Sequence, residues 1–110
     1  MNVLGIETSC DETGIAVVAD GRRIVAGEVA SQIDIHRVFG GVVPEIASRH
    51  HTECISQIAD AVIARAEGRV DAIAATIGPG LMGSLLVGVS FAKGLAAAMD
   101  ELIAAEIIPP

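Results

Sequence analysis

The sequence predicts an α/β fold built on a mixed sheet, in which three strands precede a helix, a fourth strand and a second helix. Three features predict it: strand-length apolar runs near the start, an apolar repeat of three and four residues after Pro44, and a short apolar run before a glycine-rich turn. The chain has 110 residues, which suits one domain with one core. Because only 2% of the residues are aromatic, aliphatic side chains must fill that core.

The first thirty residues predict a meander of three antiparallel strands. Residues 3–8 are apolar on both faces, which is typical of a central strand. Residues 13–19 form the second expected strand. The Asp20-Gly21 pair then signals a hairpin turn, since both residues tolerate positive φ. Residues 22–30 form the returning strand.

A loop and a helix are expected next. Residues 31–45 show no clear period, and a loop of that length is often functional. Pro44 suits the first turn of a helix, where its missing N–H has no cost. One apolar helix face follows, ending near Gly68 and made of Ala47, His51, Cys54, Ile55, Ile58, Val62 and Ala66.

The second half predicts a parallel strand and an apolar helix. Residues 71–77 follow a helix, so a right-handed crossover places them parallel to the first strand. Residues 78–84 form a glycine-rich turn, and a helix runs over about 81–99. Three interior glycines each cost about 1 kcal/mol relative to alanine, so this helix is expected to lie close to another backbone. The tail, 100–110, either extends the helix or contains a fifth strand from "AEIIP".

This β-β-β-α-β-α(-β) order is that of a half-domain of actin-like and sugar-kinase-like ATPases, a statement about fold alone. The net charge of −7 disfavours independent nucleic-acid binding, so any basic surface must come from elsewhere. Cys10 and Cys54 match no disulfide or metal spacing, and the first residues are not a signal peptide, so a reducing cytoplasm is expected. The run "LLVGVSFAKGLAAAM" contains Lys93 and is shorter than the roughly 20 residues that span a bilayer, so no membrane contact is expected.

The stretch "ETSCDETG" holds the candidate site. Neighbouring strand residues point to opposite faces, so Asp11 and Glu12 share a site only if the chain turns between them. One interpretation is a solvated tight turn. The other is a ligand site, in which Thr8, Ser9 and backbone N–H groups donate to phosphate while the acids hold a metal ion or orient a water. Cys10 is expected to be a small buried residue, because neighbouring acids raise its pKa.

Other motifs carry weaker signals. Glu7 lies in the first strand and is placed to point into a cleft. "GPGLMGS" lacks the GK[ST] ending of a Walker A loop, so a tight turn is favoured over an anion site at the helix start. The histidines His36, His50 and His51 have no i, i+4 partner. His51 falls on the apolar helix face and is expected to be a packing residue.

Taken together, "VLGIETSCDETGIAVV", "SQIDIHRVFGGVVPEIASRHH" and "IGPGLMGSLLVG" resemble, in order and spacing, the start of TsaD proteins, formerly called Gcp, glycoprotease or O-sialoglycoprotein endopeptidase. The resemblance covers the chain to about residue 100. It implies an actin-like ATPase (ASKHA, ribonuclease H-like) fold in a cytoplasmic acyltransferase. Such enzymes move a threonylcarbamoyl group from threonylcarbamoyl-adenylate to N6 of adenosine 37 in tRNAs that read ANN codons. It also implies that Asp11 and Glu12 are tied to catalysis.

The resemblance implies limits and partners as well. The family holds one Fe or Zn ion per subunit through an H-x-x-x-H motif expected just after residue 110. Residues 1–110 are therefore expected to be an N-terminal subdomain with no metal ligand and no activity alone. A TsaB-like paralogue or a second copy is expected to pair through helices at about 45–66 and 81–99, with a TsaE-like ATPase and tRNA in the full complex.

Two other functions stay open from the sequence. A non-catalytic, TsaB-like interaction module is one, although "CDET" and "GGVVPEIASRHH" favour the enzyme. A metallopeptidase, the historical name of the family, is the other. The sequence contains no H-E-x-x-H motif and no convincing nucleophile with a base, so nothing in it supports peptide hydrolysis.

Overall fold

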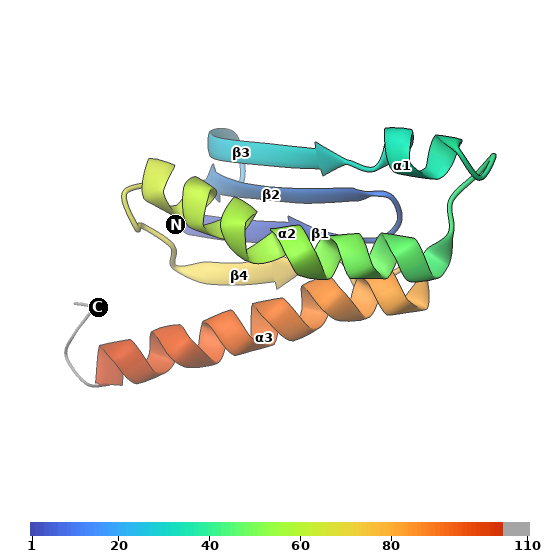
Figure 1. The fold of residues 1–110 in the computed structure, drawn as a ribbon. Coiled ribbons are helices and arrows are strands. Elements are labelled where there is room, and N and C mark those ends of the chain that lie inside the picture. Colours follow the sequence, from blue (N-terminus) through green and yellow to red (C-terminus); the bar gives the residue numbers. More distant parts are fainter. Residues whose placement is uncertain (105–110) are drawn as a thin grey trace.

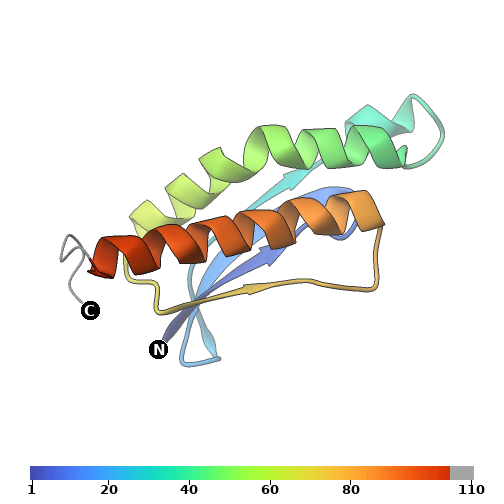
Figure 2. The same ribbon diagram turned by 90° about the horizontal axis from the view of Figure 1, so that it is seen from below.

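A computed structural model describes residues 1–104 as a four-stranded sheet with helices on one face (Figures 1 and 2). The strand order is β3-β2-β1-β4, and the strands are β1 (Asn2–Glu7), β2 (Glu12–Ala19), β3 (Arg23–Ser31) and β4 (Ala72–Ala75). β1 pairs with β2, and β2 with β3, in antiparallel register, whereas β1 and β4 are parallel. The predicted meander, the interior position of the first strand and the parallel crossover are confirmed.

The described residues form three helices: α1 (Ile33–Arg37) and α2 (Pro44–Arg65) between β3 and β4, and α3 (Met82–Ala104) after β4. α2 begins at Pro44 as predicted. It stops before Gly68, whose φ of +71° is in the left-handed region and whose N–H donates to the Ile63 carbonyl at 2.9 Å. α2 and α3 lie side by side on the same face of the sheet (Figures 1 and 2).

The segment 31–45 was expected to be a loop, and this prediction is wrong for its first part, which forms the short helix α1. The Gln32 carbonyl accepts hydrogen bonds from the N–H groups of Ile35 and His36. The buried Gln32 and His36 side chains lie 2.7 Å apart, Oε1 to Nε2, and His36 Nδ1 accepts from the Val43 N–H at 3.1 Å. Because buried polar contacts stabilise α1, the pattern of apolar residues in the sequence does not predict this helix.

The two faces of the sheet differ sharply. The face under the helices carries aliphatic side chains that are at most 3% exposed, namely Leu4, Ile6, Ile15 and Val17. The opposite face is built from small residues, which are Gly5, Gly14, Ala16, Gly27 and Ala74. Two large apolar side chains on β3 stand exposed at its edge, Ile24 at 70% and Val29 at 63%. The described core therefore lies between the sheet and the two long helices.

α3 is longer than predicted. It runs to Ala104, so helical continuation is the correct interpretation as far as that residue, and the alternative strand at 105–109 lies outside the described residues. This run was predicted to be too short to span a bilayer, and that prediction is wrong: the helical window Met82–Asp100 has a mean hydropathy of 1.5 and is long and apolar enough to cross a membrane by length and composition. One such helix is weak evidence for a membrane, and α3 packs against α2, β4 and β1.

The glycines of α3 bear out the expectation of close packing at one position. A Cβ on Gly88 would lie 2.5 Å from the Thr8 hydroxyl oxygen, so the helix touches β1 there. A Cβ on Gly83 would make ordinary contact with Ser48 at 3.6 Å. Nothing lies within 4 Å of a Cβ built on Gly94, where the prediction is wrong.

Candidate functional site

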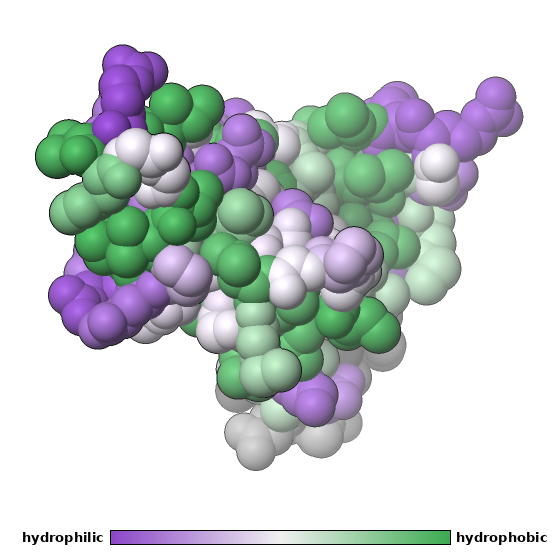
Figure 3. All heavy atoms as spheres, turned by 90° about the vertical axis from the view of Figure 1, so that its right-hand side faces the viewer, coloured by the Kyte–Doolittle hydropathy of each residue, from purple (hydrophilic) through white to green (hydrophobic). Residues whose placement is uncertain are grey.

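The motifs singled out in the sequence meet at one end of the molecule, on the right in Figure 1. This end holds the bend between β1 and β2, the helix α1 with the loop after it, and the starts of α2 and α3. Figure 3 looks onto this end and shows apolar side chains scattered among hydrophilic ones. The most exposed apolar residues of these segments are Val38, Phe39, Ile77 and Met82.

The bend at residues 9–11 is anchored through three successive carbonyls. The Ser9 carbonyl accepts from the Leu81 N–H at 2.8 Å, just before α3. The Cys10 carbonyl accepts from Nε2 of His51 on α2 at 2.9 Å. The Asp11 carbonyl accepts from the Gln32 N–H at 2.9 Å. Three residues that are distant in sequence thus hold one short turn, and they lie in the two other stretches that carry the motifs, 31–51 and 77–88.

This anchoring turns backbone N–H groups outward. In a trans peptide the C=O and the following N–H point in opposite directions. The Ser9 and Cys10 carbonyls are drawn toward the protein, so the N–H groups of Cys10 and Asp11 point away from it. Within residues 1–104 neither N–H donates to a protein acceptor. Successive free N–H groups on a turn form an arrangement that binds anions such as phosphate.

The two residues predicted to bind phosphate have different surroundings. Thr8 is 1% exposed, donates its hydroxyl to the Ser84 carbonyl at 2.6 Å and accepts from the Gly88 N–H at 3.1 Å. Its only hydroxyl proton is thus committed, and Thr8 ties β1 to α3. Ser9 is half-buried on the bend itself, and Gly80 lies so close that a Cβ would come within 2.6 Å of the Ser9 carbonyl oxygen. Of the two, Ser9 is the residue whose side chain is still accessible.

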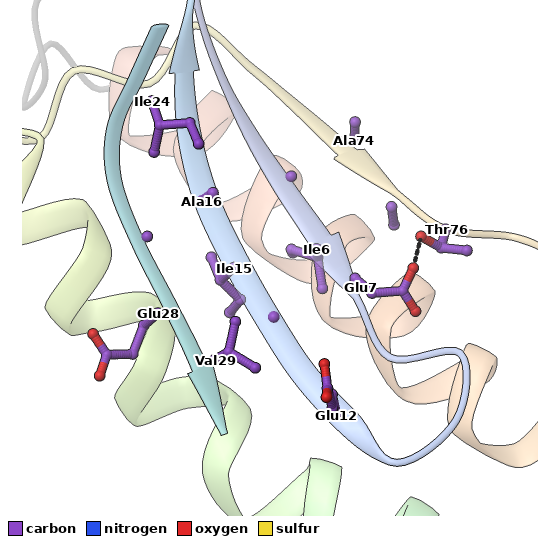
Figure 4. Close-up of a pocket in the computed structure, with 14 residues that line it drawn as sticks. Ile6, Glu7, Glu12, Ile15, Ala16, Ile24, Glu28, Val29, Ala74 and Thr76 are labelled. Carbon is purple, nitrogen blue, oxygen red and sulfur yellow. Dashed lines mark hydrogen bonds between the residues drawn. The ribbon is translucent and has the colours of Figure 1, made fainter. Parts of the chain in front are cut away.

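Two glutamates line a depression on the open face of the sheet (Figure 4). The depression has a volume of about 710 Å³, and Glu7 at the end of β1 and Glu12 at the start of β2 sit at the same end of it. Glu7 accepts from the Thr76 hydroxyl at 2.6 Å and from the Ser9 N–H. Burial alone would raise the pKa of Glu7, but the hydrogen bonds from Ser9 and Thr76 outweigh it and hold the pKa below its usual value.

The adjacent acids do not share this depression. Glu12 lines it, whereas Asp11 does not and lies half-exposed on the bend. This separation follows from the alternation of side chains at the start of β2. Glu7, which the sequence placed toward a cleft, is the acid that accompanies Glu12. Glu7 pairs with Gly14 in the β1–β2 ladder, and Glu12 lies two residues before Gly14, so both acids lie on the same face of the sheet. The sequence alone did not show that Asp11 would instead accompany the outward N–H groups.

Buried polar groups support the bend from beneath. His51 is fully buried, with Nδ1 2.6 Å from the Thr13 hydroxyl oxygen, so the packing role predicted for it is confirmed. Burial lowers the pKa of His51 and favours the neutral ring. Burial, and then the Asp11 carboxylate, raises the pKa of the Cys10 thiol, in the predicted direction. Across residues 1–104 no three His, Cys, Asp or Glu side chains are grouped as metal ligands, so these residues do not fit the ion that the family resemblance implies.

Comparison with known proteins gives a consistent result. A family model described as "TsaD: tRNA N6-adenosine threonylcarbamoyltransferase" matches residues 23–104. A tRNA N6-adenosine threonylcarbamoyltransferase of Caldicellulosiruptor saccharolyticus is 62% identical over 98 residues, which are 86% of this chain and 29% of that protein. The enzyme of the same name from Moorella thermoacetica is 57% identical over 103 residues, which are 91% of this chain and 30% of that protein.

The fold has a solved counterpart. The structure of YeaZ from Pseudomonas aeruginosa matches 90% of this chain and 40% of its own with a TM-score of 0.65 at 22% identity. A second solved structure, described as an uncharacterized protein with similarity to peptidase YEAZ from Pseudomonas aeruginosa, matches equally well. These matches support the predicted half-domain of the actin-like ATPase fold. The chain spans less than a third of the length of the sequence relatives named above.

Proposed function

Because the chain belongs to the TsaD family, we propose that it forms the N-terminal lobe of a tRNA N6-adenosine threonylcarbamoyltransferase. The donor is threonylcarbamoyl-adenylate and the acceptor is N6 of adenosine 37 in tRNAs that read ANN codons. The lobe supplies one wall of the active site, and the remaining length of the relatives supplies the other. The 110 residues alone are inactive in this proposal.

The bend between β1 and β2 is the observation that carries the proposal. Its outward N–H groups, on Cys10 and Asp11, suit the phosphate of the adenylate, since backbone donors on a turn bind anions without a basic side chain. Asp11 lies on the same bend, and Glu12 follows it at the edge of the sheet depression. A phosphate held at the bend therefore brings the donor's reactive carbon close to carboxylate groups.

These carboxylates suit the chemistry of transfer. N6 of the adenosine forms a bond to the carbamoyl carbon, the bond from that carbon to the phosphate oxygen breaks, and AMP leaves. N6 must lose a proton in the process, and a carboxylate at the bend accepts it as a general base. The outward N–H groups stabilise the charge that gathers on the leaving phosphate. Asp11 and Glu12 are the catalytic residues in this assignment, with Ser9 as a further phosphate donor.

The acidic surface of the lobe sets where tRNA contacts lie. A chain with a net charge of −7 repels a phosphate backbone, so the basic surface that holds tRNA belongs to the rest of the protein or to its partners. In this proposal the metal ion is likewise held by the rest of the protein. This lobe contributes the acids and the phosphate-binding turn.

We also propose that α2 and α3 form the surface that binds a TsaB-like paralogue or a second copy of the lobe. A groove of about 550 Å³ runs between these helices, lined by Ile55 on α2 and by Leu86, Val87 and Phe91 on α3. Leu86 is 59% exposed, which leaves apolar surface facing outward. Sedimentation of the chain alone and with a TsaB-like protein tests this, and Leu86→Glu is expected to abolish association. Unchanged association would exclude this surface.

The alternative function is that of a non-catalytic, TsaB-like interaction module. YeaZ, a TsaB-like protein, shares the fold at 22% identity, and fold alone does not separate an enzyme from a non-catalytic relative. The curated relatives at 57 to 62% identity carry the transferase name, which favours the enzyme. Peptide hydrolysis has no support in the described residues.

Reconstitution of the full-length protein that contains residues 1–110 tests the function. It is incubated with threonylcarbamoyl-adenylate and tRNA, and the modified nucleoside is measured by mass spectrometry. One of the two acids is the base, and its amide variant, Asp11→Asn or Glu12→Gln, is expected to lower the rate at least about a hundredfold, the scale of lost general-base catalysis. Asp34→Asn removes an exposed acid of α1 and serves as the matched control. Full activity in both acid variants would contradict the proposal.

A further inference from the structure

His51 differs from the other two donors that hold the bend. The Ser9 and Asp11 carbonyls accept from backbone N–H groups, whereas the Cys10 carbonyl accepts from the His51 imidazole at 2.9 Å. This is therefore the one of the three anchors that a side chain determines. The ring is 0% exposed and lies on α2, forty-one residues along the chain from Cys10.

The position of each proton on the His51 ring follows from its partners. A carbonyl oxygen only accepts, so Nε2 carries hydrogen and donates to Cys10. The neutral ring then has a lone pair on Nδ1, which accepts the Thr13 hydroxyl at 2.6 Å. The Thr13 oxygen in turn accepts from the Cys54 thiol at 3.3 Å. The hydrogen bonds run in one direction, from Cys54 through Thr13 and His51 to the bend.

We propose that His51 is a positioning residue for the transfer reaction, because it fixes the orientation of the Cys10–Asp11 peptide. The peptide is planar and rotates as a unit. While its carbonyl is held inward by His51, the Asp11 N–H points outward. Without that bond the peptide is free to turn over, which would present a carbonyl oxygen where the phosphate binds. The inference rests on the proposed function, since it assigns the phosphate of the donor to this bend.

Substitution of a residue that served only for packing would lower the stability of the protein and leave its reaction kinetics unaltered. Substitution of a positioning residue changes the kinetics for the one substrate that it helps to bind. Loss of the His51 anchor is expected to affect the adenylate, which contacts the bend, and to leave the KM for tRNA unchanged. The size of the effect is that of one hydrogen bond to a buried group, about tenfold or more.

The experiment compares His51→Ala, His51→Gln and His50→Gln in the full-length protein that contains residues 1–110. The glutamine amide at position 51 can still donate to the Cys10 carbonyl. His50 is the half-buried neighbour whose ring has only a weak contact with Cys54, at 3.9 Å, and gives the matched control. We expect His51→Ala to lower kcat/KM for the adenylate at least about tenfold, His51→Gln to restore most of it, and His50→Gln to match the wild type.

Nitrogen-15 NMR of the imidazole in the 110-residue chain tests the geometry independently of activity. We expect a neutral ring with hydrogen on Nε2 at neutral pH. Hydrogen on Nδ1, or a charged ring, would overturn the inference even if the enzyme is active.

Other outcomes are equally decisive. A folded His51→Ala enzyme with wild-type kcat/KM, or one whose KM for tRNA rises as much as that for the adenylate, would overturn the inference. If His51→Ala does not fold, His51→Asn takes its place, because its amide is too short to reach the carbonyl. A wild-type enzyme that forms no modified nucleoside would refute the proposed function, and the NMR result would still decide whether His51 holds the bend.

Discussion

The two long helices hold the same bend in opposite ways. α2 reaches it with a side chain: the His51 ring bridges Thr13 and the Cys10 carbonyl. α3 reaches the residue just before the bend through a missing side chain, since Gly88 lets the Thr8 hydroxyl meet the helix backbone. The α2 contact is therefore broken by removing atoms, and the α3 contact by adding them. On the α3 side, position 88 must therefore stay small. On the α2 side, position 51 must keep its hydrogen-bonding groups.

The largest expected effect lies on the α3 side. Gly88→Ala puts a methyl group 2.5 Å from the Thr8 oxygen, which costs about 3 kcal/mol of strain, offset by about 1 kcal/mol of improved helix propensity. We expect a net loss of about 2 kcal/mol in the free energy of unfolding, measured by urea denaturation. Gly94→Ala is the matched control, because nothing lies within 4 Å of its Cβ, and it is expected to stabilise the chain by up to about 1 kcal/mol. Equal effects at both positions would contradict the close contact.

A change on the α2 side is expected to be somewhat smaller. Thr13→Val keeps the shape of the residue but leaves Nδ1 of His51 without a donor, at a cost of about 1.5 kcal/mol. Thr52→Val makes the same change at an exposed position on α2 and is expected to alter the free energy of unfolding by less than about 0.5 kcal/mol. If the two variants were equally stable, the Thr13–His51 bond would contribute nothing.

The smallest expected effect is a change in how stability depends on pH, and only the α2 contact should show it. Burial lowers the folded-state pKa of His51 below its ordinary value of 6.5, so the unfolded chain takes up a proton first as the pH falls. The stabilisation that the neutral His51 ring contributes is fully present above the unfolded-state pKa of 6.5. It is lost as the pH falls from there toward the folded-state pKa. We expect His51→Gln to flatten the dependence of the urea midpoint on pH between about 7.5 and 5.5. Gly88→Ala, on the other helix, should leave that slope as in the wild type.

The sequence predicted the parts of the fold that depend on apolar periodicity. The three meander strands, the parallel strand and both long helices follow from such patterns. The short helix α1 does not, because the buried pair Gln32 and His36 builds it through polar contacts between residues four apart. A polar pair of that kind resembles a loop in any pattern based on hydropathy.

The site was partly predictable for a related reason. The acids and the bend are local in sequence, so "CDET" indicated them. The anchors are not local: Leu81, His51 and Gln32 reach the bend only through the tertiary fold. The direction of the Cys10 and Asp11 N–H groups depends on those anchors and has no counterpart in the sequence. For the same reason Thr8 looked like a phosphate ligand, although the fold commits its hydroxyl to α3.

The most direct test is a crystal structure of the full-length protein with a stable analogue of threonylcarbamoyl-adenylate. We predict that a phosphate oxygen lies about 3 Å from the N–H groups of Cys10 and Asp11, with the Asp11 carboxylate beside the carbamoyl carbon. The His51 ring should still contact the Cys10 carbonyl. An analogue bound elsewhere, with the bend open to solvent and both acids facing away from it, would contradict the account.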